Sequence, residues 1–376
     1  MLRPLLSDVL TDSAWTLVAA DATVPTSRTI KIKDAIHRRN PIASIAIQVA
    51  VTGGTATGAA ALLNADGIAN VLKSVQLFRN GVDAGSGTSR QKGRVQVCDW
   101  SGATILEYMK NTSGIDRTTL AGLALTPANS TTHVLNYVID FAHPQLDEPL
   151  HSHTLLPVHL DAFNPELVLN FAAQSEIDVH ATTPTYKMSA LAFKVTVNRV
   201  DLPAEDTAAI LARGGFIDRV FVEKEYQINS KQKWALVIDS PGIYEGLLLK
   251  SYRTAAVRGD IIDAANTGWL LKQQGSTRRE FHTDMLLAEN ERTSLATAAF
   301  TAGSLYLDFL SSGVGNAENA IRSCFNANLE ANNGQNSQIE AFLDPVGNSG
   351  SLTTAKVKLA GVAMLGDISS RINSLV

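Results

Sequence analysis

Residues 189–216 read SALAFKVTVNRVDLPAEDTAAILARGGF, a strand pattern followed directly by a helix pattern. Apolar and polar side chains alternate in residues 189–200, as expected for a strand that buries one face. Asp201 can cap a helix, Pro203 suits its first turn, and two glycines stop it after Arg213. The stretch therefore predicts a linker helix between two β-rich parts of the chain, docked through Ile210 and Leu211.

Short alternating or β-branched runs, bounded by Gly, Pro, Asn or Asp, dominate both sides of this helix. The strands expected before it are 26–36, 41–54, 72–81, 93–100, 133–144, 166–172 and 189–200. The strands expected after it are 218–228, 231–239, 243–253, 303–310, 323–331 and 355–365. Two segments, 60–72 and 103–114, have helical spacing instead, as expected for short helices inside loops.

The two halves also show three short matches in the same order, which indicates an internal duplication. NYVIDFAHP is matched by LYLDFLSSG, ELVLNFAAQSEI by NANLEANNGQNSQI, and ALAFKVTVNRV by AKVKLAGVAML. The matched positions are Asp140-Phe141 with Asp308-Phe309, Leu169 with Leu329, and Val195 with Val357.

Two all-β units of this size, each with about eight strands, are typical of sandwiches or jelly rolls. The connection over residues 142–165 is long for a hairpin, whereas a jelly roll must carry the chain between its two sheets. The expected boundaries are an N-terminal arm at 1–27, a first jelly roll at 28–200, a linker helix at 201–215, a second jelly roll at 216–367 and a C-terminal tail at 368–376.

This organisation, and the runs VIDFAHPQLDEPL at 138–150 and LPVHLDAFNPELVLNFA at 156–172, resemble the double jelly-roll major capsid proteins of the tectivirus, corticovirus and adenovirus lineage. In that family a strand ends at proline, an acidic turn follows, and a loop leads to a PxLxLxF-like strand. The second half departs from this pattern, because no proline corresponding to Pro144 follows its Asp-Phe pair.

The resemblance implies an all-β double jelly roll that forms homotrimers of pseudo-hexagonal outline in the icosahedral capsid of a membrane-containing bacteriophage. Implied partners are the chain itself, neighbouring capsomers, vertex (penton) proteins and an internal viral membrane reached through the N-terminal arm. The implied location is the virion, after synthesis in the host cytoplasm. The resemblance implies no enzyme activity, cofactor or small-molecule substrate.

Composition agrees with a protein built for packing: 45% of residues are hydrophobic, 18% are charged, and the formal net charge is −4. No overall positive field would attract nucleic acid, so specific nucleic-acid binding is not expected. The one basic stretch alternates, as in a solvated strand face; its residues are Arg28, Lys31, Lys33, Arg38 and Arg39. The two cysteines, Cys98 and Cys324, lack metal-binding spacing and are expected to be buried or partly buried thiols. No apolar window is long enough to span a membrane, although LLSDVL could form an amphipathic turn on a surface.

Histidines at 151, 153 and 159 raise the alternative of a two-domain cupin-like metalloenzyme. His151 and His153 would point to the same face of a strand. However, the cupin carboxylate is missing downstream, and only Asp147 and Glu148 precede the histidines. The three histidines are therefore expected to be structural, and no metal ligand or catalytic residue is assigned.

The remaining motifs have ordinary structural explanations. The glycine-rich segments 53–63 and 81–94 lack phosphate-loop spacing, and no GxSxG motif occurs. The acidic pair Glu205-Asp206 suits a helix start. A carbohydrate-binding β-sandwich is the third alternative, but the tryptophans form no evenly spaced platform and are expected to be buried in the core or at an interface; they are Trp15, Trp100, Trp234 and Trp269.

Overall fold

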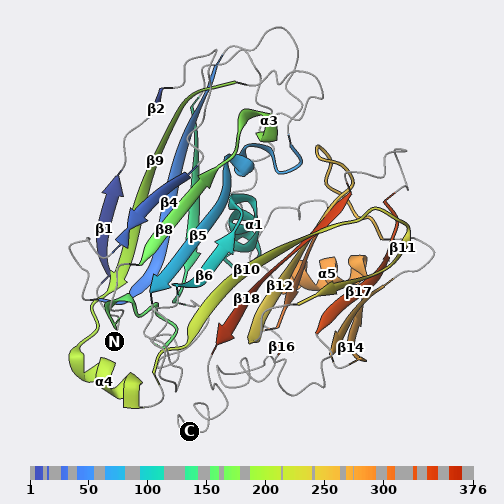
Figure 1. The fold of residues 1–376 in the computed structure, drawn as a ribbon. Coiled ribbons are helices and arrows are strands. Elements are labelled where there is room, and N and C mark those ends of the chain that lie inside the picture. The colour runs from blue at the N-terminus through green and yellow to red at the C-terminus, as the bar shows by residue number, and fades with distance from the viewer. Residues whose placement is uncertain are drawn as a thin grey trace.

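Two β-rolls standing side by side form the computed structural model of the chain (Figure 1). The structure describes residues 5–11, 15–16, 27–32, 40–54, 64–80, 94–113, 132–142, 153–160, 165–177, 187–212, 215–238, 242–262, 268–273, 275–293, 303–309, 325–327, 337–345 and 355–365.

The strands form three sheets. A five-stranded sheet has the order β1-β9-β4-β7, with β2 beside β9; its strands are β1 (Leu5–Thr11), β2 (Trp15–Thr16), β4 (Ile42–Gly54), β7 (Thr132–Asp140) and β9 (Lys187–Val200). A nine-stranded sheet has the order β15-β12-β18-β10-β6-β5-β8-β3, with β16 beside β12. Its strands are β3 (Ser27–Lys31), β5 (Leu72–Asn80), β6 (Arg94–Trp100), β8 (Glu166–Phe171), β10 (Asp218–Gln227), β12 (Ile243–Tyr252), β15 (Ser304–Asp308), β16 (Phe325–Asn326) and β18 (Lys356–Leu365). A four-stranded sheet has the order β11-β17-β13-β14, with β11 (Gln232–Val237), β13 (Trp269–Gln273), β14 (Ser276–Phe281) and β17 (Gln338–Leu343).

Helices occupy the connections. They are α1 (Gly102–Ser113), α3 (Gln174–Ile177), α4 (Ala204–Ala212) and α5 (Thr283–Thr293), with 3₁₀ turns η2 (Gly67–Val71) and η4 (Val158–Leu160). Within the described ranges, none of these helices has the length and apolar character that a membrane crossing requires.

The nine-stranded sheet belongs to both rolls. Its β6-β5-β8-β3 part faces the five-stranded sheet and completes the first roll, whereas its β15-β12-β18-β10 part faces the four-stranded sheet and completes the second. The halves join where β6 and β10 run parallel, with Cys98 opposite Phe221. The two rolls are therefore connected by a continuous backbone sheet as well as by side chains.

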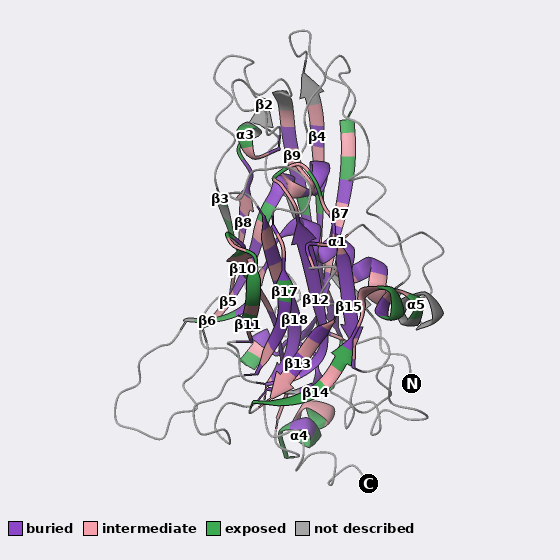
Figure 2. Cartoon of the chain, turned by 90° about the vertical axis from the view of Figure 1, so that its right-hand side faces the viewer, coloured by how far each residue is buried: buried purple, intermediate pink, exposed green. Residues whose placement is uncertain are grey.

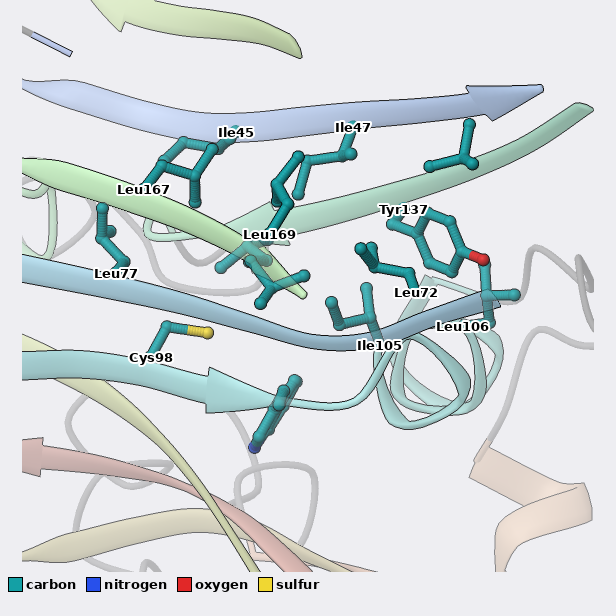
Figure 3. Close-up of a cluster of buried hydrophobic side chains, with 14 of the residues drawn as sticks. Ile45, Ile47, Leu72, Leu77, Cys98, Ile105, Leu106, Tyr137, Leu167 and Leu169 are labelled. Carbon is teal, nitrogen blue, oxygen red and sulfur yellow. The ribbon is translucent and has the colours of Figure 1, made fainter. Parts of the chain in front are cut away.

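Each roll has its own apolar interior, supplied by alternate residues of its strands. In the first roll, Ile45 and Ile47 of β4 face Leu167 and Leu169 of β8, and all four side chains are buried (Figure 3). In the second, Leu247 and Leu249 of β12 belong to an equivalent cluster. Burying such side chains stabilises the fold by roughly 1.5–3 kcal/mol each. Strands with one buried face therefore carry alternating apolar residues, and this alternation predicted strands in both rolls.

The internal duplication predicted from sequence appears as a repeat of topology. The sheet order β1-β9-β4-β7 is matched by β10-β18-β12-β15, and in chain order α1 before β7 is matched by α5 before β15. Asp140 pairs with Ser44, and Asp308 pairs with Gly246, immediately after a bulge in each partner strand. The predicted match of Asp140 with Asp308 is therefore confirmed.

The other two predicted matches are wrong in register or position. Ile47 pairs with Val195, and the equivalent Leu249 pairs with Leu359, so Val195 corresponds to Leu359 and not to Val357. Leu329 lies outside the described residues, and β17 takes the place of β8 in the second roll. Both errors arise because the loops of the two rolls differ in length. A short sequence match does not show how many residues are inserted between equivalent strands.

Several local predictions also need correction. Residues 60–72 form no α-helix in their described part but the 3₁₀ turn η2, with Gly67 at φ 58°. LLSDVL is part of strand β1, paired with β9, and not an amphipathic turn. In α4, Ile210 is buried, but Leu211 is 49% exposed, so the helix is not docked through Leu211. Four elements were not predicted from the sequence: β13, β14, β17 and α5.

Candidate functional site: the boundary between the rolls

The boundary between the two rolls contains the largest collection of buried charges among the described residues. On the first-roll side lie the end of β6, helix α1 and the turn before η2. On the other side lies the outer face of β10, β12 and β18 in the second roll, opposite the face that lines its interior. This boundary decides how one roll is oriented against the other.

Helix α1 is fixed closely against its own roll before it contacts the second. A Cβ atom on Gly102 would lie 2.8 Å from the Leu72 carbonyl oxygen and 2.8 Å from the ring of Tyr137. Real Cβ atoms do not approach backbone oxygens so closely, so only glycine fits here without movement. The start of α1 therefore faces the second roll at a defined depth.

Glu223 of β10 forms hydrogen bonds with Ser101, the residue that precedes this helix. Its carboxylate accepts hydrogen bonds from the Ser101 backbone N–H at 2.8 Å and from the Ser101 hydroxyl at 3.0 Å. Lys358 lies 3.2 Å from the same carboxylate, and Lys250 lies 3.9 Å from it. The Lys250 ammonium also donates to the hydroxyl of Thr104 on α1. A negative group at a helix N-terminus is stabilised by the unpaired amides there.

These contacts determine the protonation states. Burial opposes ionisation of Glu223, but Lys250, Lys358 and the Ser101 amide outweigh it and lower the pKa of Glu223 to about 2. Burial lowers the pKa of Lys250, while Glu223 and Asp66 oppose that change. Burial also acts to lower the pKa of Lys358, but Glu223 and Asp66 raise it overall.

A second cluster surrounds Arg258. Its guanidinium donates to Glu107 of α1 at 2.8 and 3.1 Å and to Asp66 at 2.9 Å. The Tyr252 hydroxyl also donates to Asp66, at 2.9 Å, and the Arg258 guanidinium lies 4.9 Å from the centre of the Tyr252 ring. Burial opposes ionisation of Asp66, but Lys250, Arg258 and Lys358 lower its pKa to about 2. Both acids come from the first roll, whereas Arg258 and Tyr252 come from the second.

A third contact lies near the end of β7. Arg219 and Glu245, 2% and 0% exposed, are joined by hydrogen bonds of 2.8 and 2.6 Å. The Arg219 guanidinium also donates to the backbone carbonyls of Asp140 and Phe141 in the first roll. Paired, hydrogen-bonded geometry of this kind is what allows two charges to be buried together.

Aromatic rings fill the space between these charged groups. The Trp100 ring lies 4.9 Å from both Tyr108 of α1 and Phe221 of β10, and its indole N–H donates to the Val222 carbonyl at 2.9 Å. Tyr108 also contacts Tyr306 of β15, with ring centres 5.9 Å apart. Such tilted and edge-to-face pairs add directional packing to the burial of apolar area.

These contacts join four carboxylates and four cations: Asp66, Glu107, Glu223 and Glu245, with Arg219, Lys250, Arg258 and Lys358. Each charge is used internally in a contact that links elements of the boundary. These paired contacts hold the two rolls in one orientation.

The described part of the histidine-rich segment, residues 153–160, packs against the residues that follow helix α4. His153 is buried, and its carbonyl accepts the Ile217 backbone N–H at 2.8 Å. The ring of His159 lies 5.8 Å from Phe216, and Leu156 bridges to Ile42 at the start of β4. The segment therefore packs the chain that follows α4 against the first roll.

His151, Asp147 and Glu148 lie outside the described residues, so a site containing them is not tested. Across the ranges that the structure describes, no group of three or more His, Cys, Asp or Glu side chains is arranged to hold a metal ion. The structural assignment of the three histidines stays a prediction.

The other residues selected from sequence are placed as follows. Cys98 is a buried thiol, and burial raises its pKa further from neutrality; Trp100 and Trp269 are buried as expected. Glu205 and Asp206 lie in the first turn of α4, as expected for a helix start. Cys324, the basic residues Lys33, Arg38 and Arg39, and most of the glycine-rich segments lie outside the described residues.

Comparison with known proteins gives matches in structure alone: no family model and no curated protein sequence matches the chain. The crystal structure of the STIV major capsid protein superposes with a TM-score of 0.59 at 16% identity, covering 96% of this chain and 97% of that one. The atomic structure of Sulfolobus Turreted Icosahedral Virus also matches with a TM-score of 0.59 at 16% identity, covering 96% and 90%. A quasi-atomic model of the PBCV-1 virus capsid matches with a TM-score of 0.58 at 10% identity, covering 97% and 94%.

The chain has the double jelly-roll fold of viral capsid proteins. The predicted fold class is thereby confirmed, with eight strands in each roll besides the short β2 and β16. The predicted resemblance to double jelly-roll capsid proteins is confirmed at the level of the fold.

The charged boundary was not predicted from the sequence. A signal for it was present in IYEGLLLKSYR, where Glu245 and Lys250 interrupt an apolar strand. Charged residues are almost never fully buried unless they are paired, so charges within such a run indicate a second packed face. Their partners could not be identified, because Arg219 and Glu223 lie on another strand, β10, and Thr104 lies on the first roll.

Proposed function

We propose that this chain is the major capsid protein of an icosahedral virus, and that its function is to self-associate into the shell. The observation that carries the proposal is a double jelly roll over nearly the whole chain, matching capsid proteins over 97% and 94% of their own lengths. The boundary between the rolls supports it, because a shell subunit must keep its two lobes in one orientation.

The subunit that we propose is a homotrimer of pseudo-hexagonal outline, because three copies of a two-roll chain present six similar lobes. Its further partners are neighbouring capsomers, vertex (penton) proteins and an internal membrane approached through the N-terminal arm. We propose 28–200 and 216–367 as the two rolls, 201–215 as their linker, and 1–27 and 368–376 as arm and tail. Strand β1 lies within residues 1–27 and, by pairing with β9, is one of the eight strands of the first roll.

Measurement of mass in solution tests this proposal most directly. Light scattering of the purified 40.2-kDa chain should give the mass of three copies, and negative-stain images should show six-lobed particles. A protein that stays monomeric at micromolar concentration would contradict the trimer. For the arm, flotation with anionic lipid vesicles should be lost when residues 1–4 are removed, and retained when residues 368–376 are removed.

A further inference from the structure

The internal repeat shows that one surface is covered in the second roll but open in the first. The sheet β10-β18-β12-β15 packs its outer face against α1 and β6, within the chain. The equivalent sheet, β1-β9-β4-β7, has no part of the described chain packed on its outer face over β4 and β7, as the exposure of Gln48 and Val134 shows. Because the two sheets are equivalent, we expect an element equivalent to α1 to cover the open one.

The strand register identifies the equivalent side chains. Ser44 and Gly246 follow the bulges of β4 and β12, so Ala46 corresponds to Leu248 and Gln48 to Lys250. Leu248 and Lys250 are 1% and 0% exposed because the first roll covers them. Gln48 is exposed, and Ala46 is partly exposed.

The outward side chains of β4 itself are uncharged, and the charged Lys194 of β9 lies opposite Gln48. The Gln48 amide donates to Asn136 of β7 at 2.9 Å, and the hydroxyls of Thr52 and Thr132 lie 2.8 Å apart. Val134 on β7 is 41% exposed. The polar side chains of this face already have hydrogen-bond partners within the sheet, and exposed apolar side chains lie beside them. Covering such a surface with another protein therefore costs little free energy of desolvation.

The second roll carries the matching open element. Helix α5 stands in the repeat where α1 stands in the first roll, and Met285 is its third residue, as Thr104 is the third of α1. Thr104 is fully buried and contacts Lys250, whereas Met285 is 64% exposed, with Asp284 and Ala288 exposed beside it. Figure 2 shows α5 at the side of the molecule with exposed residues along it.

We propose that the outer face of β9, β4 and β7 in one copy packs against α5 of a neighbouring copy. This contact repeats between chains the contact that β18, β12 and β15 make with α1 within the chain. Three copies would then close a ring of six rolls through three internal and three external boundaries of the same kind. The inference rests on the proposed trimer and specifies which surfaces form it.

Charge substitutions on the two surfaces test the inference. Met285→Glu and Val134→Glu should each raise the trimer dissociation constant at least roughly tenfold, because an unpaired carboxylate would be buried on association. Phe342→Glu is the matched control, since Phe342 is 40% exposed on β17 in the opposite sheet of the second roll. The control should dissociate as the wild-type protein does.

A cross-link gives an independent readout. The Gln48→Cys/Met285→Cys double variant should form covalent trimers under mild oxidation, whereas either single variant should not. A wild-type monomer would overturn the trimer itself and with it this interface. A stable wild-type trimer that neither glutamate weakens, or whose cysteines do not cross-link, would overturn the interface and leave the proposed capsid function standing.

Discussion

The interiors of the rolls and the boundary between them are both buried, but they are built from different chemistry. Ile45 and Ile47 occupy an interior that requires only apolar side chains of suitable size. Arg219 and Glu245 occupy a boundary in which each charge needs one partner in one place. The comparison indicates that the interiors supply most of the stability, whereas the boundary selects one orientation of the rolls.

Breaking one boundary pair should have the largest effect. Glu245→Ala leaves the Arg219 guanidinium buried without its carboxylate, and we expect a loss of about 3–5 kcal/mol in the free energy of unfolding. Urea denaturation of the variant and the wild-type protein measures it.

The double variant Arg219→Leu/Glu245→Ala tests whether the boundary pair behaves differently from apolar packing in an interior. Removing both charges should restore part of the loss, because no lone charge remains, although the Asp140 and Phe141 carbonyls lose a donor. A double variant less stable than Glu245→Ala would show that the pair behaves as ordinary packing.

Acid should weaken the boundary while leaving apolar interior contacts untitrated. Asp66 and Glu223 have pKa values of about 2, below their ordinary values of 3.8 and 4.5. Their stabilisation is therefore complete above about pH 4.5 and lost as the pH falls toward 2, at roughly 2–3 kcal/mol for each group. Unfolding free energies measured from pH 6 to pH 2.5 should show this decline.

Glu223→Gln is the control for the acid effect. The variant should be less stable than wild type at pH 6 and should lose less stability on acidification, because one titrating carboxylate is gone. Parallel pH profiles for the two proteins would contradict the assigned role of Glu223.

The same contrast explains what could be predicted from sequence. Strands that alternate, such as β4 and β9, were located almost to the residue, because each has one buried face. Strand β14 was missed because STRREF is exposed along most of its length and has no apolar alternation. The boundary was missed for another reason: partners such as Glu107 and Arg258 are far apart in sequence, and only the fold brings them together.

The close fit of α1 offers a smaller test of the boundary. Gly102→Ala should cost about 1–3 kcal/mol, since the added methyl group must displace the Leu72 carbonyl or the Tyr137 ring. Thr283→Ser, at the equivalent start of α5, keeps its hydroxyl bond to Asp260 and should change stability by less than about 0.5 kcal/mol. Thermal unfolding of both variants makes the comparison, and equal shifts would show that α1 is not held more tightly than α5.

The smallest effect is expected on the helix that joins the rolls. Leu211 is 49% exposed on α4, so Leu211→Asp should change the free energy of unfolding by less than about 0.5 kcal/mol. Its neighbour Ile210 is 4% exposed, and Ile210→Asp should cost several-fold more because an unpaired carboxylate would be buried. The two variants carry the same new charge on adjacent residues, so their difference isolates burial from any effect of charge on the helix. Equal melting temperatures for the two would mean that α4 does not pack through Ile210, and that the orientation of the rolls depends on the boundary without help from the linker.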